Sequence, residues 1–280
     1  VNKAIRYTRS SHGDGRSFSV TMGACSSATN LTDVPAMPAA DAEKIHPQIF
    51  AIMRNGHEVL RGTLVDASAS LQRPDADAEV LKAFAKDWDA FVHWSFLHQR
   101  MEDGVPGEAS GLFALLDEVA GGIATSSKLP DEHLKIITLE HAITQALTKR
   151  DLPALRSAFA TFMPENDQHY KMEEDVMMPQ IMKLAKDGHP VRKTMIERIL
   201  PAVPASELYF FISHAMRTLE QHSGGQPRAR AFAHALQAAA SSEKQWLAWR
   251  VLIQRSLPPE EYAKIAKEID LTIWGQACYA

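Results

Sequence analysis

Two pairs of histidine and glutamate are the features of this sequence that are best suited to chemistry. His98 is followed four residues later by Glu102, and His169 is followed four residues later by Glu173. Residues four apart lie about 5 to 6 Å from each other on one face of a helix, so each pair can bind one metal ion or hold two adjacent ions. Each pair alone is a weak signal, because a chain with 12 histidines contains roughly one such pair by chance.

Both pairs continue the apolar stripe of the segment that carries them. Apolar residues recur there at alternating steps of four and three, which is the spacing of one helix face. The segments of about 44–70 and 130–149 show the same spacing and place His57 and His141 on it, respectively; His46 lies on the stripe of the first segment as well. Four imidazoles and two carboxylates buried without partners would cost several kcal/mol for each charge, and metal coordination removes that cost.

The sequence therefore predicts a centre that holds two metal ions. Imidazole and carboxylate ligands without thiolate favour iron, with manganese as the alternative, and bridging carboxylates can hold two divalent ions together. The predicted ligands are His57, His98, Glu102, His141, His169 and Glu173.

Three neighbouring residues are weighed beside this set. His133 lies eight residues before His141, about 80° round the helix, and is a candidate to hydrogen-bond to a ligand from outside the centre. Glu174 is the alternative to Glu173, which is better aligned with the apolar stripe. His46 lies about three turns from His57, too far for the same centre.

The wider pattern predicts an all-α fold. Four long amphipathic segments between residues 41 and 187 predict a four-helix bundle, whose core commonly hosts cofactors. Residues 1–40 lack periodicity and are predicted to be a disordered tail, whereas residues 188–280 are predicted to be a C-terminal helical extension. In the fourth segment Pro164 predicts a kink or a restart of the helix.

Composition narrows the class of protein. The net charge is −4 and no basic run occurs, which argues against a nucleic-acid partner or an anionic membrane. No stretch approaches the roughly 18 apolar residues of a spanning helix, and we expect no membrane partner. Two cysteines near opposite ends give neither a disulfide framework nor a thiolate metal site, so the sequence is read as cytoplasmic.

The order and spacing of these residues resemble the hemerythrin-like (HHE cation-binding) domain over roughly residues 41–185. The resemblance is carried by the run His57-Glu58-Val59-Leu60-Arg61, by His98-x-x-x-Glu102-Asp103, by His141 after Leu139-Glu140, and by His169-x-x-x-Glu173-Glu174. It implies a four-helix up-down bundle around a non-haem di-iron site with an oxo or hydroxo bridge. It also implies that the four histidines are terminal ligands and that Glu102 and Glu173 bridge the irons.

One departure from the family bears on function. Oxygen-carrying hemerythrins have a fifth histidine one turn from the ligand on the third helix, and Ile137 and Gln145 stand at those positions here. The resemblance therefore implies a protein that binds or reacts with dioxygen, nitric oxide or peroxide in sensing, detoxification or iron homeostasis, rather than in oxygen transport. The cysteine pair of the related proteins that repair iron centres is lacking as well, so their activity is not carried over.

Two other classes of protein are considered. A ferritin-like carboxylate oxidase needs two Glu-x-x-His motifs, and only Glu43-Lys44-Ile45-His46 fits, which disfavours that class. The remaining alternative is a metal-free helical interaction module that uses the C-terminal extension as a platform for a protein partner. A partner on these helices is also compatible with a metal-binding bundle.

Overall fold

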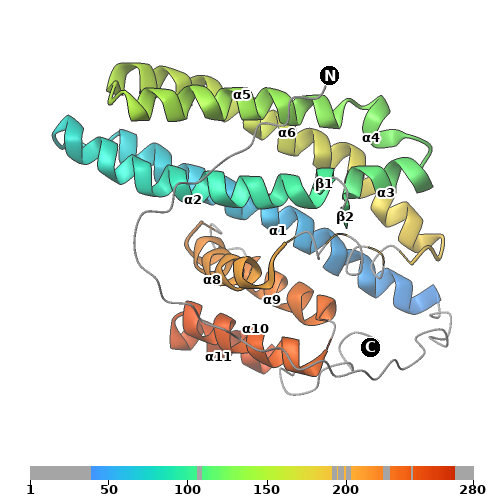
Figure 1. Ribbon diagram of the computed structural model, residues 1–280. Coiled ribbons are helices and arrows are strands. Elements are labelled where there is room, and N and C mark those ends of the chain that lie inside the picture. Colours follow the sequence, from blue (N-terminus) through green and yellow to red (C-terminus); the bar gives the residue numbers. More distant parts are fainter. Residues whose placement is uncertain are drawn as a thin grey trace, which may run out of the picture. The chain divides into compact units, whose positions relative to one another are not determined.

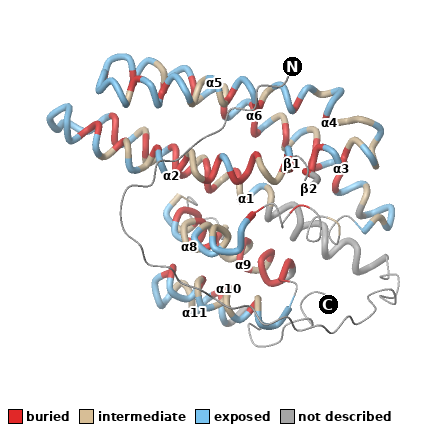
Figure 2. The backbone as a smooth tube through the Cα atoms, in the orientation of Figure 1, coloured by how far each residue is buried: buried red, intermediate tan, exposed pale blue. Residues whose placement is uncertain are grey.

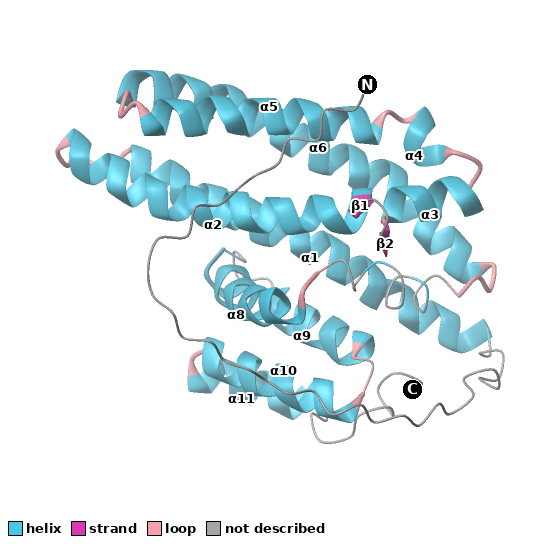
Figure 3. Ribbon diagram, viewed as in Figure 1, coloured by secondary structure: helices cyan, strands magenta, loops and turns pink. Residues whose placement is uncertain are grey.

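The computed structural model describes residues 39–105, 109–190, 194, 199, 203–222, 228–240 and 242–268. Within these residues the fold is all-α, as predicted, apart from one pair of two-residue antiparallel strands (Figure 3). The first half contains α1 (Ala39–Leu71), α2 (Asp77–Asp103), β1 (Gly104–Val105), β2 (Ala109–Ser110), α3 (Leu112–Val119), α4 (Ile123–Ser126), α5 (Leu129–Thr148) and α6 (Leu152–Lys186). The second half contains α8 (Ala205–His222), α9 (Arg228–Ala239), α10 (Glu243–Ser256) and α11 (Pro259–Glu268).

Four long helices pack together as two helical hairpins. Short loops join α1 to α2 and α5 to α6, and α1 also packs against α6 while α2 packs against α5 (Figure 1). Buried residues recur along one side of α2, and the largest of them are aromatic (Figure 2). Phe84, Trp88 and Phe91 of α2 meet Phe159 and Phe162 of α6 with ring centroids 5.3 to 6.3 Å apart, which is the usual spacing of aromatic pairs in a core.

The ends of two of these helices follow from local sequence. Helix α5 begins with Pro130 in its first turn, followed by Asp131 and Glu132, whose charges suit the positive end of the helix dipole. Helix α2 ends at Gly104, which has a φ of 82° and turns the chain into β1. This turn comes two residues after Glu102, so that carboxylate lies in the last turn of α2.

Of the two outcomes predicted at Pro164, a kink or a restart of the helix, the restart is wrong. Helix α6 runs without interruption from Leu152 to Lys186, with Pro164 and Pro179 inside it. A proline in a helix removes a single backbone hydrogen bond, and the neighbouring side chains of Phe162 and Asn166 are buried in the core. Tertiary packing therefore carries the helix through this position.

The C-terminal helices pack on the outer side of α1. Helices α8 and α9 both contact α1, and α10 packs on α8, around a second apolar cluster that includes Phe232, Trp246 and Trp249. Helical periodicity in the sequence predicts helices near Glu207–Leu219, from Arg228 through Trp249, and after Pro259. The first and the last are confirmed as α8 and α11, whereas the second is divided into two helices, α9 and α10.

Some expectations fall on residues that are not described. The predicted tail lies outside the described residues up to residue 38, and so does most of the helix predicted near Met195–Leu200. The chain from Ala36 onward forms one compact unit. None of the described helices combines the length and the apolar character that a membrane crossing requires.

Candidate metal centre

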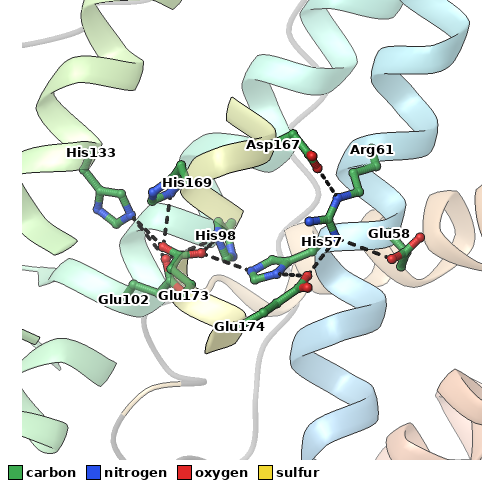
Figure 4. A network of polar contacts seen from close by, with 10 residues as sticks. All are labelled: His57, Glu58, Arg61, His98, Glu102, His133, Asp167, His169, Glu173 and Glu174. Carbon is green, nitrogen blue, oxygen red and sulfur yellow. Dashed lines mark hydrogen bonds and ion pairs between the residues drawn. The ribbon is translucent and has the colours of Figure 1, made fainter. Parts of the chain in front are cut away.

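Six side chains from the four long helices converge in one buried cluster (Figure 4). Each of the six is at most 9 % exposed. The members are His57 from α1, His98 and Glu102 from α2, His133 from α5, and His169 and Glu173 from α6. This His/Glu cluster contains five of the six residues predicted as ligands.

Glu173 lies at the middle of the His/Glu cluster. Its Oε2 is 3.2 Å from Nε2 of His57 and 3.5 Å from Nε2 of His98. Its Oε1 is 3.1 Å from Nε2 of His169 and 3.3 Å from Nε2 of His133. The two oxygens of one carboxylate thus divide the four imidazoles into two pairs.

Glu102 joins the same two pairs from the other hairpin. Its Oε2 is 3.2 Å from Nε2 of His98 and 3.3 Å from Nε2 of His133. Two groups of possible ligand atoms result, each with all its atoms within 4.8 Å of one another. The first consists of His57, His98, Glu102 and Glu173, and the second of His133, His169 and Glu173. A cluster of this composition can hold a metal ion.

The structure does not bring His141 to the cluster. His141 is exposed, and its Nε2 lies 2.7 Å from the side-chain nitrogen of Gln145. The position expected for the third-helix histidine is taken by His133, which is 1 % exposed and for which the sequence predicts only an outer hydrogen-bonding role. The prediction that His141 lies in the core is therefore wrong.

The physical reason is the rotation of α5 about its axis. Two overlapping stripes run along this helix. The stripe through Leu134 and His141 faces solvent, and Leu134 is 65 % exposed. The stripe that begins at Leu129 and passes through His133, Ile136 and Ile143 is buried. The sequence feature that could have identified His133 is this second stripe, because Leu129, Ile136 and Ile143 lie on the same helix face as His133.

Several polar atoms of the cluster have no hydrogen-bond partner among the described residues. They are Nε2 of His57, His98 and His169, both carboxylate oxygens of Glu102, Oε2 of Glu173 and Nδ1 of His169. Each such buried atom costs about 1 to 3 kcal/mol, and more when the group is charged. Imidazole nitrogens and carboxylate oxygens that face one another across a buried space fit a metal cation, whose coordination would satisfy them.

The charges of the cluster influence one another strongly. Burial lowers the pKa of His57, but the adjacent carboxylates of Glu173 and Glu174 outweigh burial and raise it to about 9. Burial lowers the pKa of His169 to about 3, aided by the nearby His133, His98 and His57. Burial and the charge of Glu173 raise the pKa of Glu102. Burial acts upward on Glu173 as well, but the surrounding imidazoles hold its pKa well below the ordinary value.

Two histidines of the cluster are oriented by carboxylates outside it. His57 Nδ1 donates to Glu174 Oε1 at 2.9 Å, and Arg61 donates to the same oxygen at 2.7 Å (Figure 4). His133 Nδ1 donates to Asp103 Oδ2 at 2.9 Å. Such bonds fix the imidazole with Nε2 toward the cluster and make that nitrogen a better metal ligand. Arg61 and Asp103 had not been assigned this role from sequence, because their partners lie on other helices.

Aromatic side chains and a close backbone contact enclose the cluster. Tyr170 stacks on His57 with ring centroids 4.8 Å apart, and Phe113 of α3 lies 5.0 Å from the ring of His133. A Cβ atom at Gly111 would lie 2.1 Å from the backbone oxygen of Glu102, so glycine permits the chain to pass directly over the end of α2. Besides the four long helices, Phe113 of α3 and the backbone at Gly111 therefore border the cluster.

Compared with known proteins, the chain matches no family model, no curated protein sequence and no solved structure, so the interpretation of this centre rests on its own geometry.

Proposed function

We propose that this chain is a non-haem di-iron protein of hemerythrin type, which binds or reacts with dioxygen, nitric oxide or peroxide. The observation that carries the proposal is the position of Glu173, whose two oxygens face two different pairs of imidazoles. A carboxylate placed in this way suits a bridge between two metal ions, each with two histidine ligands. The second carboxylate, Glu102, faces one histidine of each pair and is the second candidate bridge.

The arrangement of helices supports the same proposal. Helices α1, α2, α5 and α6 form two hairpins, and each hairpin contributes two histidines and one glutamate. We infer that they form an up-down bundle, in which such sites are built from side chains on facing helices.

The donor set favours iron, with manganese as the alternative. Four nitrogen and two carboxylate donors, without thiolate, suit borderline divalent ions. Bound iron would supply open coordination positions for a diatomic molecule or peroxide and the electrons to reduce it. The residues around it would orient and protect the site: Glu174 and Asp103 hold His57 and His133 in place, while buried Tyr170 and Phe113 keep water out. We place the role in sensing, detoxification or iron homeostasis.

The proposal is tested by the metal content and visible spectrum of the full chain purified from iron-replete cells. We expect about two irons per chain, with ferric absorption that bleaches on reduction and returns on exposure to air. A content of two manganese ions per chain would keep the two-metal centre and change the metal from iron to manganese. A colourless protein that neither retains nor can be reconstituted with metal, and whose stability is indifferent to chelators, would overturn the proposal in favour of the metal-free interaction module.

A further inference from the structure

Tyr170 lies among three of the four histidines of the His/Glu cluster. Its ring stacks on His57 with an angle of 14° between the planes, and its centroid is 5.8 Å from that of His98 and 5.6 Å from that of His169. The whole residue is 1 % exposed. The phenol is therefore part of the wall of the centre.

The hydroxyl group of Tyr170 has no hydrogen-bond partner among the described residues. The side-chain oxygen of Asn166, one helical turn earlier on α6, is equally buried and has no hydrogen-bond partner in this part of the chain. Burial has the larger effect on the pKa of Tyr170 and raises it, but the Asn166 side chain is nevertheless close enough to the phenol to lower it. Burying an unpaired hydroxyl is unfavourable, and a phenylalanine would stack on His57 without that cost. The stacking of the ring therefore does not require the hydroxyl, and no hydrogen bond within the described residues accounts for it.

His57 and His133 cannot donate a hydrogen bond from Nδ1 to a bound molecule as the Tyr170 hydroxyl can. The Nδ1 atoms of these two residues already donate to Glu174 and Asp103. A small anion or diatomic molecule that binds a metal ion gathers negative charge on its outer atom, and a positioned donor stabilises that charge. A tyrosine hydroxyl is such a donor and carries no charge of its own.

We propose that Tyr170 donates a hydrogen bond to a small ligand bound at the metal centre, and that Asn166 provides the second polar group of the same subsite. The ligand class is small anions and diatomic molecules with a free lone pair on the outer atom. This inference rests on the proposed function, because it requires a metal ion in the His/Glu cluster.

The test compares Tyr170→Phe with the wild-type protein and with Tyr209→Phe, which removes a hydroxyl from a tyrosine that is 40 % exposed on α8. Azide is titrated into each iron-loaded, air-oxidised full chain, and its binding is followed in the visible spectrum. We expect Tyr170→Phe to keep its iron and to raise the azide dissociation constant about tenfold, the effect of one hydrogen bond. Tyr209→Phe is expected to leave the constant unchanged.

A second measurement does not depend on metal. The melting temperature of metal-free Tyr170→Phe should equal or exceed that of the metal-free wild type, because an unpaired buried hydroxyl has been removed. A lower melting temperature would show that the hydroxyl has a partner inside the protein and would overturn the inference. Loss of iron from Tyr170→Phe would do the same, since the hydroxyl would then support the ligands themselves.

The remaining outcomes separate this inference from the proposed function. An unchanged azide dissociation constant in iron-loaded Tyr170→Phe overturns the role of Tyr170 and leaves the metal centre standing. A wild-type protein that takes up no metal overturns the proposed function and this inference together. Asn166→Leu, which removes the neighbouring amide, should weaken azide binding less than Tyr170→Phe does, and a larger loss would assign the donor to Asn166 instead.

Discussion

His133 and His141 provide a matched pair for testing the ligand set, because they lie on the same helix and differ in burial. We expect His133→Ala to weaken metal binding by more than about 100-fold, since removal of an outer partner alone costs 10- to 100-fold. His141→Ala should leave metal affinity unchanged, because that side chain is exposed and contacts Gln145. Metal titration of the two variants checks this. Equal losses in both would show that the change acts through α5 as a whole.

The carboxylate behind His57 gives a second prediction. Glu174→Gln should reduce metal affinity about tenfold, because Glu174 accepts hydrogen bonds from both His57 and Arg61. The control is Asp175→Asn, a change at the next residue, whose exposed side chain pairs with Lys171. Competition with a chelator measures both affinities. If Glu174→Gln binds metal as tightly as the control, the carboxylate does not orient His57.

The side chains that the sequence could identify are those whose helix has one dominant apolar stripe. Helix α2 carries Trp88, Phe91 and Leu81 on the stripe that leads to His98, so its buried face was evident. Helix α5 has two stripes one residue apart, and each contains apolar residues. Which one is buried depends on the helices packed against it, and this information is not local to the segment. His133 therefore emerged only from the structure.

At the scale of helices, the contact between α1 and α8 depends on a missing side chain. A Cβ atom at Gly62 would lie 2.6 Å from Cγ2 of Thr218 and 3.0 Å from Cδ2 of His222. We expect Gly62→Ala to lower the free energy of unfolding by about 1 to 3 kcal/mol, the usual cost of overpacking. Gly56→Ala on the same helix is the control, since a Cβ there meets nothing within 4 Å.

The control variant should become more stable rather than less. Replacing glycine with alanine in a helix interior raises the free energy of unfolding by about 0.5 to 1 kcal/mol. Urea denaturation of both metal-free variants gives the comparison. A Gly62→Ala protein as stable as Gly56→Ala would mean that α8 can shift away from α1 without loss.

The sequence predicted which segments are helical better than it predicted where a helix is interrupted or which helices pack together. The segments around α2 and α8 were evident from periodicity, whereas Pro164 suggested a break that packing of Phe162 and Asn166 overrides. The pairing of the C-terminal helices with α1 could not be foreseen, because the contacts join residues more than a hundred positions apart, such as Thr63 and His214.

For the whole molecule, metal should act as a stabilising ligand. Binding to the folded state alone stabilises a protein by about 4 kcal/mol when the free metal exceeds the dissociation constant a thousandfold. We expect the melting temperature to fall on chelation and to recover on addition of ferrous iron under exclusion of air. His98→Ala, which lacks one member of the His/Glu cluster, should show a smaller response to chelation, and an equal response would place the stabilising ion elsewhere.

Stability should also depend on pH through His214, which holds α8 against α1. Burial lowers its pKa to about 4, aided by Arg217 and His93 and opposed by Asp66. Between about pH 6.5 and 4 the unfolded chain binds the proton more readily than the folded one, so this contribution is complete above pH 6.5 and is lost as the pH falls toward 4. His214→Gln keeps a polar group beside Thr63. It should remove the contribution of His214 to the change of the free energy of unfolding with pH.

We expect His214 to contribute about 2 kcal/mol to the free energy of unfolding above pH 6.5. Partial burial of its side chain keeps this contribution small, because solvent screens part of the interaction. Denaturation of wild type and His214→Gln at several pH values measures it as a difference, so the contributions of other histidines cancel. Parallel curves for the two proteins would show that His214 is not the group that titrates.

The division of the six cluster residues between the hairpins determines the order in which the centre forms. His57, His98 and Glu102 belong to the first hairpin, and His133, His169 and Glu173 to the second. Contacts within a hairpin are local in sequence and form early in folding, whereas docking of the hairpins closes a longer loop and comes later. During synthesis the cluster is therefore completed only after α6 has emerged, and a nascent chain that carries the first hairpin alone presents three of the six cluster residues.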